Sequence, residues 1–282
     1  MRVIERAAEL AETLDASRAR GATVGFVPTM GALHQGHLSL LGAARQECDV
    51  VAMSVFVNPL QFGPGEDLER YPRDPAGDRR QAEDAGVDVA FLPSGDQVYP
   101  RAPLTSVRVS ELSEPLEGAA RPTHFEGVAT VVAVLFNLVG RCRAYFGEKD
   151  YQQLLVVRRL VADLRFPVEV SSRPTVREPD GLAVSSQNTR LGPAERAAAP
   201  VLHRALLAGR RQVAAGEVDR DRVEAAMAEV LDTEPLVRPD YVVAVRSSDL
   251  ASVPRLAGEV RLLVAARLGD VRLIDNLGAE VP

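Results

Sequence analysis

The sequence predicts an α/β fold in which a mainly parallel sheet is followed by a smaller α+β domain. From residue 23 to about residue 175, short β-rich runs alternate with helical patterns, as in proteins whose parallel strands are connected by helices. Residues 49–57 (DVVAMSVFV) are nearly all apolar, which is typical of a strand buried on both faces. The alternation stops at a turn-rich stretch, residues 174–186, so we place the domains at residues 1–175 and 176–282.

The first domain is expected to contain five strands and four helices. The helix at 150–165 shows the pattern used for all of them, because its apolar residues Leu154, Val157 and Leu164 share one helical face. Helices that alternate with parallel strands are expected to cover both faces of the sheet. The expected strands are residues 23–28, 49–57, 87–92, 143–146 and 168–171. The expected helices are residues 36–48, 74–86, 125–139 and 150–165.

The second domain is expected to be a small α+β unit. The junction PTVREPDGLAVSS is rich in turn formers and has no clear period. Two Ala-rich helical stretches follow, and Leu268-Gly269-Asp270 is a plausible tight hairpin between the last two strands. The expected helices are residues 193–215 and 218–232, and the expected strands are residues 241–245, 260–267 and 271–274.

The overall composition argues against several classes of protein. The net charge is −6 and the pI about 5.4, so broad attraction to nucleic acid or to an anionic membrane is not expected. No run approaches the ~18 apolar residues of a membrane span, and residues 1–20 lack the apolar core of a signal peptide. Cys48 and Cys142 form no C-x-x-C pair and flank apolar runs, so we expect buried free thiols and a cytoplasmic protein.

The segment PTMGALHQGH, residues 28–37, is the first candidate for chemistry. It connects an expected strand to an expected helix, and helix N-termini at the carboxyl ends of parallel strands bind phosphates. His34 and His37 can donate to phosphate oxygens, and protonated imidazoles can neutralise charge on a departing pyrophosphate. A zinc pair or two surface histidines are the alternatives. No nearby cysteine or acidic pair completes a zinc site, so we expect no protein metal site here.

The second candidate is the segment NPLQFG, residues 58–63, directly after the second expected strand. Amides at a strand's carboxyl end, here Asn58 and Gln61, can hydrogen-bond a hydroxy acid without adding charge. A turn with solvated amides is an equally good interpretation. The loop at residues 63–75 is long, polar and glycine-bearing, which suits either a lid or an inert surface loop.

The third candidate is FGEKD, residues 146–150, between an expected strand and an expected helix. The ammonium of Lys149 can hold phosphates through a transition state, and Asp150 can bind a ribose or a Mg²⁺ hydration shell. Alternatively, Asp150 and Gln153 form a capping box and Lys149 is a solvated charge. The fourth candidate, the segment SSQN at residues 185–188, could bind phosphate or merely cap a helix.

Together these segments strongly resemble the pantoate–β-alanine ligase family. The order and spacing match over about residues 24–191, are looser over 192–240 and recover near the C-terminus. HxGH alone would indicate only the wider nucleotidyltransferase superfamily, whereas its combination with FGEKDYQQ is far more specific. The segments that carry the resemblance are PTMGALHQGH, FVNPLQF, HFEGVATVV, YFGEKDYQQL, PTVREPDGLAVSSQN and VAARLGDVRLIDN.

The resemblance implies a Rossmann-like first domain, a smaller C-terminal lid domain and a homodimer. It also implies an AMP-forming carbon–nitrogen ligase of pantothenate and coenzyme A biosynthesis. The substrates would be pantoate, β-alanine and ATP with Mg²⁺. Pantoate would attack the α-phosphate of ATP to give pantoyl adenylate and pyrophosphate, and β-alanine would then displace AMP.

The resemblance also assigns individual residues. His37 would be the proton donor, with His34 and Lys149 stabilising the phosphates. Gln61 and Gln153 would bind pantoate, with Gln61 also near β-alanine. Asn58, Tyr71 and His124 would line or shape the pocket. The implied ATP-binding residues are Met30, Gly31, Ala32, Leu33, His34, Gln35, Gly36, His37, Gly147, Glu148, Lys149, Asp150, Val176, Val184, Ser185, Ser186 and Gln187.

One residue departs from the family pattern. The family usually has arginine where this chain has Gln187, and a neutral amide does not replace a guanidinium that contacts phosphates. Arg190 is a candidate for the missing charge, and weaker ATP binding or slower adenylation is the hypothesis that follows. Two other functions remain open at this point: an HxGH nucleotidyltransferase that acts on a phosphorylated acceptor, and a catalytically weak nucleotide-binding homologue.

Overall fold

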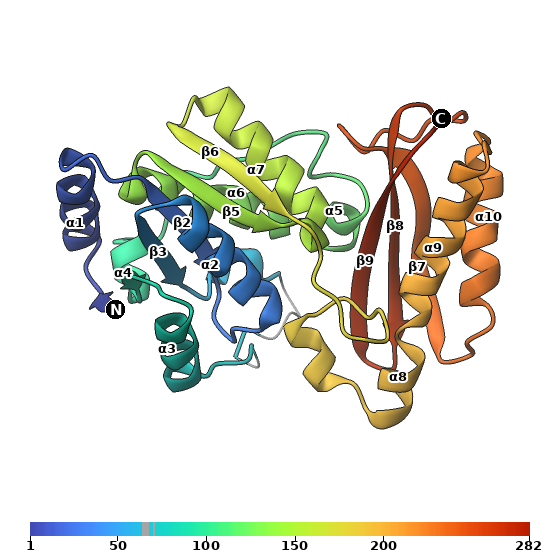
Figure 1. Cartoon of the computed structure of the whole chain (residues 1–282), viewed down its shortest axis with the longest axis horizontal. Coiled ribbons are helices and arrows are strands. Elements are labelled where there is room, and N and C mark those ends of the chain that lie inside the picture. Colours follow the sequence, from blue (N-terminus) through green and yellow to red (C-terminus); the bar gives the residue numbers. More distant parts are fainter. Residues whose placement is uncertain (64–67, 70) are drawn as a thin grey trace. The chain divides into compact units, whose positions relative to one another are not determined.

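The computed structural model describes residues 1–63, 68–69 and 71–282 (Figure 1). These residues form two units. The first comprises Met1–Gly147 and Gln152–Pro174, and the second comprises Glu148–Tyr151 and Thr175–Pro282. Each unit has its own sheet, and each is described by itself below.

Within the described residues, six strands form the sheet of the first unit, in the order β1-β4-β3-β2-β5-β6. Every pair of neighbours is parallel, so the carboxyl ends of all six strands lie at the same edge of the sheet. The order reverses between β2 and β5, which is the position where open α/β sheets bind ligands. The strands are β1 (Arg2–Ile4), β2 (Val24–Thr29), β3 (Val50–Val55), β4 (Val89–Phe91), β5 (Cys142–Gly147) and β6 (Val168–Arg173).

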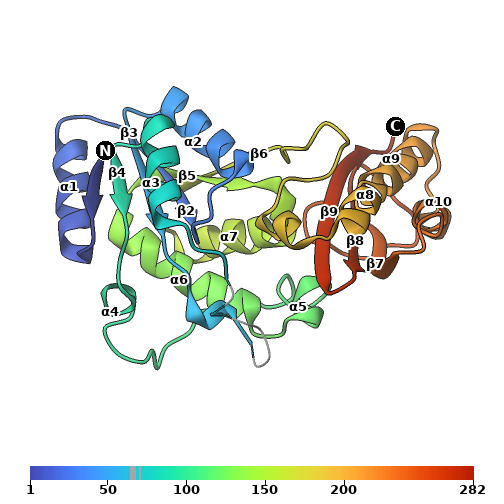
Figure 2. The same cartoon turned by 90° about the horizontal axis from the view of Figure 1, so that it is seen from below.

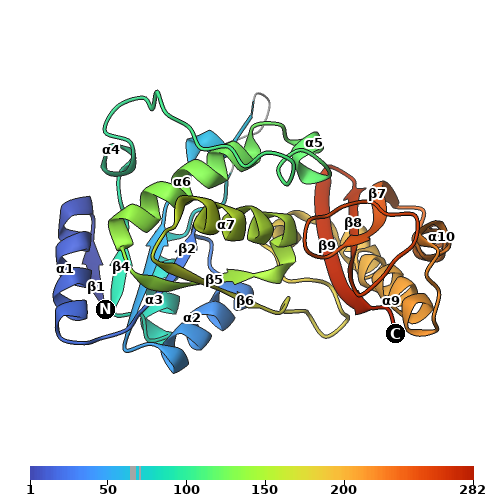
Figure 3. The same cartoon turned by 90° about the horizontal axis from the view of Figure 1, so that it is seen from above.

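Helices cover both faces of this sheet, as the alternating pattern predicted. Figures 2 and 3 show α2 (Gln35–Glu47) and α3 (Pro75–Asp84) on one face, and α6 (His124–Val139) and α7 (Tyr151–Leu164) on the other. Buried apolar residues of α2 and α3 pack against β2, β3 and β5. The described part of this unit also contains α1 (Ala7–Ala19), η1 (Pro59–Gln61), α4 (Gly95–Val98) and α5 (Glu117–Ala120).

The second unit has an antiparallel sheet of three strands, in the order β7-β8-β9, among its described residues. Its core lies between this sheet and α9 and α10, whose buried side chains include Leu202, Leu206 and Met227. The strands are β7 (Val237–Arg246), β8 (Glu259–Leu268) and β9 (Val271–Glu280). The helices are η2 (Glu148–Asp150), η3 (Ser186–Arg190), α8 (Pro193–Ala198), α9 (Val201–Ala214) and α10 (Arg220–Leu231).

The α/β fold class is confirmed, but several expected elements differ from the structure. The sequence prediction missed β1 and α1. The single helix expected at 193–215 is two helices, α8 and α9, that meet at Ala199 and Pro200, because proline has no N–H and clashes with the preceding turn. Strands β7 and β9 are longer than expected, and β7 accommodates Pro239 at the edge of its sheet, beside a register shift.

Two further expectations concern the loop after η1 and the membrane. The loop expected as a lid or an inert surface, residues 63–75, lies partly outside the described residues. Among residues 1–63, 68–69 and 71–282, no helix has the length and apolar character needed to cross a membrane.

Candidate active site

The chain leaves β2 through a tight, left-handed turn that only a small residue can occupy. Gly31 has φ +83°, and a Cβ on it would lie 2.8 Å from Asp78 Oδ2 and 2.9 Å from Val55 Cγ1. Ala32 follows with φ +51°, an uncommon conformation for a residue with a Cβ. The turn brings His34 to the N-cap of α2, as the strand–turn–helix interpretation of this segment required.

Asp78, on α3, holds this turn in place. Its Oδ2 accepts from the backbone N–H of Ala32 at 3.0 Å, and its Oδ1 accepts from that of Leu33 at 2.7 Å. The residue is 5% exposed, so the two bonds satisfy a carboxylate that is largely removed from water. These two N–H groups are therefore not phosphate donors, and Leu33 points its side chain into the core. The sequence prediction missed Asp78, because nothing in the local pattern separates it from other acidic residues of α3.

Both histidines of the motif accept a backbone N–H at Nδ1. Nδ1 of His34 accepts from the N–H of Gly36 at 3.1 Å, and Nδ1 of His37 accepts from the N–H of His34 at 3.4 Å. A ring nitrogen that accepts an N–H carries no proton, so both contacts fit an imidazole whose proton lies on Nε2. Their ring centroids are 4.0 Å apart, a distance at which two imidazolium ions would repel each other.

This arrangement favours one of the two expected roles of the pair, hydrogen bonding to phosphate oxygens. Protonated imidazoles would lose both capping bonds and would sit at the positive end of the α2 dipole. The geometry instead supports two neutral Nε2–H donors. The zinc alternative also gains no support: in the part of the chain that the structure describes, no three His, Cys, Asp or Glu side chains gather into a group that could hold a metal ion.

The segment after β3 contains two side-chain amides, and in the part of the chain that the structure describes Asn58 is hydrogen-bonded within the protein and Gln61 is not. Asn58 is fully buried. Its Oδ1 accepts from Leu60 N–H at 3.2 Å and from the Tyr99 hydroxyl at 3.1 Å, and its Nδ2 donates to Gly127 O at 3.0 Å. Asn58 therefore shapes η1, and its amide is fully buried with both acceptor positions and one of its two N–H groups already used. Gln61 is 7% exposed, and its side-chain amide makes no hydrogen bond within the described residues.

Two other residues expected in the pocket, His124 and Tyr71, contact Gln61 and its neighbour Phe62 respectively. His124 Nδ1 lies 3.1 Å from the carbonyl oxygen of Gln61, which fixes the backbone of η1. Tyr71 packs edge-on against Phe62, with ring centroids 6.0 Å apart. Both residues thus shape the segment that carries Gln61.

The two adjacent glutamines of α7 have different roles. Gln152 is buried and holds the loop before α5, because it accepts from Glu117 N–H at 3.1 Å and donates to the carbonyls of Leu112 and Pro115 at 2.9 and 2.7 Å. Gln153, the residue expected to bind substrate, is partly exposed and makes no hydrogen bond within the described residues. The expected capping box between Asp150 and Gln153 is therefore not formed.

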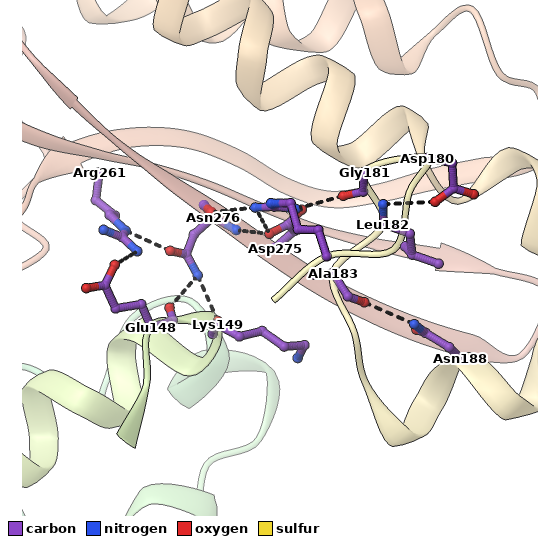
Figure 4. A network of polar contacts seen from close by, with 11 residues as sticks. Glu148, Lys149, Asp180, Gly181, Leu182, Ala183, Asn188, Arg261, Asp275 and Asn276 are labelled. Carbon is purple, nitrogen blue, oxygen red and sulfur yellow. Dashed lines mark hydrogen bonds and ion pairs between the residues drawn. The ribbon is translucent and has the colours of Figure 1, made fainter. Parts of the chain in front are cut away.

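Lys149 lies in η2, which belongs to the second unit. It is the only lysine of the chain; the other residues among the 33 lysines and arginines are all arginines. Its side chain is 19% exposed, and its Nζ lies 3.4 Å from Oδ1 of Asp150, whose side chain is 50% exposed. Figure 4 shows the backbone of Glu148 and Lys149 bonded to Asn276 of β9.

The remaining expected nucleotide residues form one loop of the second unit. Val176 and Val184 are joined by a backbone hydrogen bond of 2.9 Å. Arg177 holds the loop to β9 through a bidentate ion pair with Asp275, at 2.6 and 2.9 Å. Ser185 Oγ accepts from Gln187 N–H at 3.2 Å and so caps η3. Its own hydroxyl proton stays available, so the capping and binding interpretations are compatible.

The cysteines take no part in this site. Both are buried free thiols, and burial raises the pKa of Cys142 to about 12. Burial also raises the pKa of Tyr145, whose hydroxyl donates to Glu47 at 3.0 Å. Cys142 is thus not a nucleophile with a lowered pKa.

Each unit therefore brings together its own share of the expected residues. In the first unit, the carboxyl ends of β2, β3 and β5 place His34 and His37, Gln61 and Gly147 along one edge of the sheet. In the second unit, β9 gathers the Lys149 segment and the Val176–Gln187 loop. The chemistry offered is neutral N–H donors, uncharged amides and cations.

Known proteins resemble this chain over nearly its whole length. Residues 2–278 match the family Pantoate-beta-alanine ligase. A pantothenate synthetase of Moorella thermoacetica is 50% identical over 281 residues, which cover 100% of this chain and 99% of that one. A pantothenate synthetase of Chloroflexus aggregans is 54% identical over 265 residues, covering 93% and 96%.

Solved structures show the same likeness. The crystal structure of pantothenate synthetase from Thermus thermophilus has a TM-score of 0.93 and 52% identity, with 98% of this chain and 99% of that chain covered. The pantoate-beta-alanine ligase from Francisella tularensis, complexed with beta-gamma ATP and beta-alanine, has a TM-score of 0.80 and 32% identity, covering 98% and 97%.

Proposed function

The chain belongs to the pantoate–β-alanine ligase family, and we propose that it condenses pantoate with β-alanine in an ATP-dependent reaction, through a pantoyl adenylate. The observation that carries this proposal is the family match over residues 2–278, which includes every residue expected at the site. The Francisella tularensis relative, which holds an ATP analogue and β-alanine, supports the same substrates.

The chemistry divides into two displacements. A carboxylate oxygen of pantoate forms a bond to the α-phosphorus of ATP, and the bond between that phosphorus and the bridging oxygen breaks as pyrophosphate leaves. The amine of β-alanine then attacks the acyl carbon, a C–N bond forms, and AMP departs with the electrons of the C–O bond. The amine loses a proton in this step. A free carboxylate is a poor acyl donor, and adenylation supplies the leaving group, so no enzyme nucleophile is needed.

We assign the first displacement to the three catalytic residues of the family pattern. Nε2–H of His37 and of His34 would donate to the phosphate oxygens as negative charge moves onto pyrophosphate. Lys149 would neutralise part of that charge. The N–H groups that both Nδ1 atoms accept favour His37 acting as an Nε2–H hydrogen-bond donor rather than as a preformed imidazolium.

Pantoate recognition is assigned to the two available amides. Gln61 and Gln153 can bond the hydroxyl and carboxylate groups of pantoate without adding a charge that would compete with the reacting carboxylate. A phosphorylated acceptor would require cations at these positions, which is why the ligase is favoured over a nucleotidyltransferase. Gln61 would also lie near β-alanine.

The family pattern assigns nucleotide contacts to residues of each unit. The proposed ATP-binding residues are Met30, Gly31, Ala32, Leu33, His34, Gln35, Gly36, His37, Gly147, Glu148, Lys149, Asp150, Val176, Val184, Ser185, Ser186 and Gln187. Ala32 and Leu33 would contribute shape rather than N–H donors, since Asp78 occupies theirs. Mg²⁺ would enter as the ATP complex, and the exposed Asp150 carboxylate could bind its hydration shell.

The test is product formation with defined substrates. The protein is incubated with ATP, Mg²⁺, pantoate and β-alanine, and AMP and pantothenate are measured by chromatography. AMP formation that requires both pantoate and β-alanine supports the proposal. ATP turnover that needs a phosphorylated acceptor instead, or ATP binding without turnover, would overturn it. A cytoplasmic location and a homodimer stay predictions, the first from the sequence and the second from the family resemblance.

A further inference from the structure

We propose that Asn276 is a positioning residue for Lys149. Its Nδ2 donates to two successive carbonyls, Glu148 O at 3.0 Å and Lys149 O at 2.7 Å (Figure 4). One amide group thereby fixes the backbone from which the chain's only lysine projects. The inference rests on the proposed function, which assigns the ammonium of Lys149 to the nucleotide phosphates.

Asn276 is itself held on every side, so its amide has one orientation. Its Oδ1 accepts from Arg261 Nε at 2.7 Å, and its backbone N–H donates to Asp275 Oδ1 at 2.7 Å. Its backbone carbonyl accepts from Arg177 Nη2 at 3.3 Å. The residue is 3% exposed, which leaves little room for another rotamer. An amide fixed in this way can set the position of what it bonds.

Arg261 supplies a second hold on the same segment. Its Nη2 lies 3.2 Å from Oε2 of Glu148, and its guanidinium carbon lies 3.9 Å from the centroid of the Tyr151 ring. The Tyr151 hydroxyl is anchored in turn to Ser247, at 3.0 Å from the carbonyl oxygen. Residues 148, 149 and 151 are therefore each tied to the sheet of the second unit.

The ammonium of Lys149 is held less firmly than its backbone. Its one described partner, Asp150, is half exposed and lies at the long distance of 3.4 Å. Such a contact is weak and is readily exchanged for a phosphate oxygen. A lysine side chain has a flexible four-carbon stem and no rigid fork, so the accuracy of its placement must come from the backbone. The structure provides that accuracy through Asn276.

A purely structural role for Asn276 makes a different prediction. In that case a substitution would weaken the second unit and lower activity whether or not Lys149 is present. If Asn276 acts through Lys149, the loss must vanish once Lys149 is removed. A double-mutant cycle between the two residues therefore separates the roles.

The first measurement is steady-state AMP formation by Asn276→Asp. This change keeps the size and the acceptor for Arg261 but removes both donated hydrogen bonds. We expect kcat to fall by about 10- to 100-fold, as for a catalytic group displaced by about 1 Å, with a change in the KM for ATP of less than about threefold. In the Lys149→Ala background the same substitution should cause no further loss. A loss that is equal in both backgrounds would overturn the proposal.

A matched variant controls for stability. Glu224 accepts from the N–H of Ala244 at 2.9 Å in the same unit but makes no described contact with residues 148–151. Glu224→Ala should lower Tm without the fall in kcat. Should Asn276→Asp not fold, Arg261→Lys tests the same link, because it loses the bond that orients the Asn276 amide. Its kcat should fall, and again not in the Lys149→Ala background.

A second measurement needs no turnover. Protein labelled with ¹⁵N-lysine gives one backbone amide signal, because the chain has one lysine. Its order parameter should be about 0.85 in the wild type and below about 0.6 in Asn276→Asp. An unchanged order parameter would reject the positioning role even if the wild-type protein made no pantothenate. Absence of pantothenate formation would reject only the proposed function.

Discussion

Arg190 donates a hydrogen bond to the side-chain oxygen of Gln187, with an Nη1–Oε1 distance of 2.9 Å. The family pattern has arginine at position 187. In this chain the guanidinium of Arg190 lies beside the neutral amide that replaces that arginine. Both residues lie in η3, three positions apart, and Arg190 is exposed. The hypothesis that Arg190 supplies the missing charge therefore has a physical basis.

We expect Arg190→Gln to raise the KM for ATP by about tenfold, because one charge-assisted phosphate contact is worth about 1.5–3 kcal/mol. Adding Gln187→Arg to that variant should restore the KM. In the native background Gln187→Arg should improve KM or kcat by less than about tenfold, because Arg190 already supplies the charge. Steady-state kinetics at varied ATP provide the measurement. Arg211→Gln, which changes another exposed arginine of the same unit, is the control, and an equal effect there would sink the hypothesis.

His37→Ala should lower kcat for adenylation by on the order of 10²-fold, because it removes a donor to charge that develops in the transition state. His37→Gln should retain part of the rate, since its amide N–H can replace a neutral Nε2–H but not an imidazolium. Pyrophosphate release in a single turnover measures both. Ser39→Ala, on the exposed side of α2, should be unaffected. A near-normal rate for His37→Ala would remove this residue from the mechanism.

Asp78→Asn should destabilise the turn that carries the histidines. An amide can accept from one of the two N–H groups but turns its own NH₂ toward the other, so one donor of Ala32 or Leu33 loses its partner. We expect a loss of about 1–3 kcal/mol in the free energy of unfolding and a lower kcat. Urea denaturation and AMP formation are the measurements. Asp84→Asn, at the exposed end of the same helix, should change neither.

Gly127→Ala should displace the segment that carries Gln61. A Cβ at Gly127 would lie 2.2 Å from Leu60 O and 2.7 Å from Gln61 N, and backbone atoms cannot rotate away as a side chain can. We expect a raised KM for pantoate and a lower Tm. Gly42→Ala, in a helix with open space at the Cβ, is the matched control and should be neutral or stabilising. An unchanged pantoate KM in a folded Gly127→Ala protein would contradict this account of η1.

Cys142 should resist alkylation in the native state. Burial raises its pKa to about 12, so the reactive thiolate is about one part in 10⁴ at pH 8. Because the folded-state pKa lies above the unfolded value, this thiol contributes stability that is complete below about pH 9 and is lost as the pH rises toward 12. Mass spectrometry after iodoacetamide treatment, with and without urea, tests the first statement. Rapid labelling of Cys142 without urea would refute it.

Much of the fold could be predicted from local pattern. The apolar run that became β3 reflects burial of both faces of a strand, and the spacing in α7 reflects burial of one helical face at a period of 3.6 residues. Each signal is visible within one segment. The missed helix α1 shows the limit, because only Leu10, Leu14 and Ser17 of its 13 residues are buried and its apolar stripe is narrow. The break at Pro200 was visible in the sequence but was outweighed by the Ala-rich pattern on either side.

The sequence by itself determined which segments are proposed to carry the chemistry, because HxGH, Gln61 and Lys149 each follow an expected strand of a parallel sheet. Only the tertiary structure decided how those groups are held. Asp78 bonds Leu33 across 45 positions, and Asn276 bonds Lys149 across 127, so no local period records either contact. The proton positions of His34 and His37 likewise depend on backbone N–H groups whose direction is set by the turn. Contacts of this kind arise when distant segments meet, and so they became visible only in the folded chain.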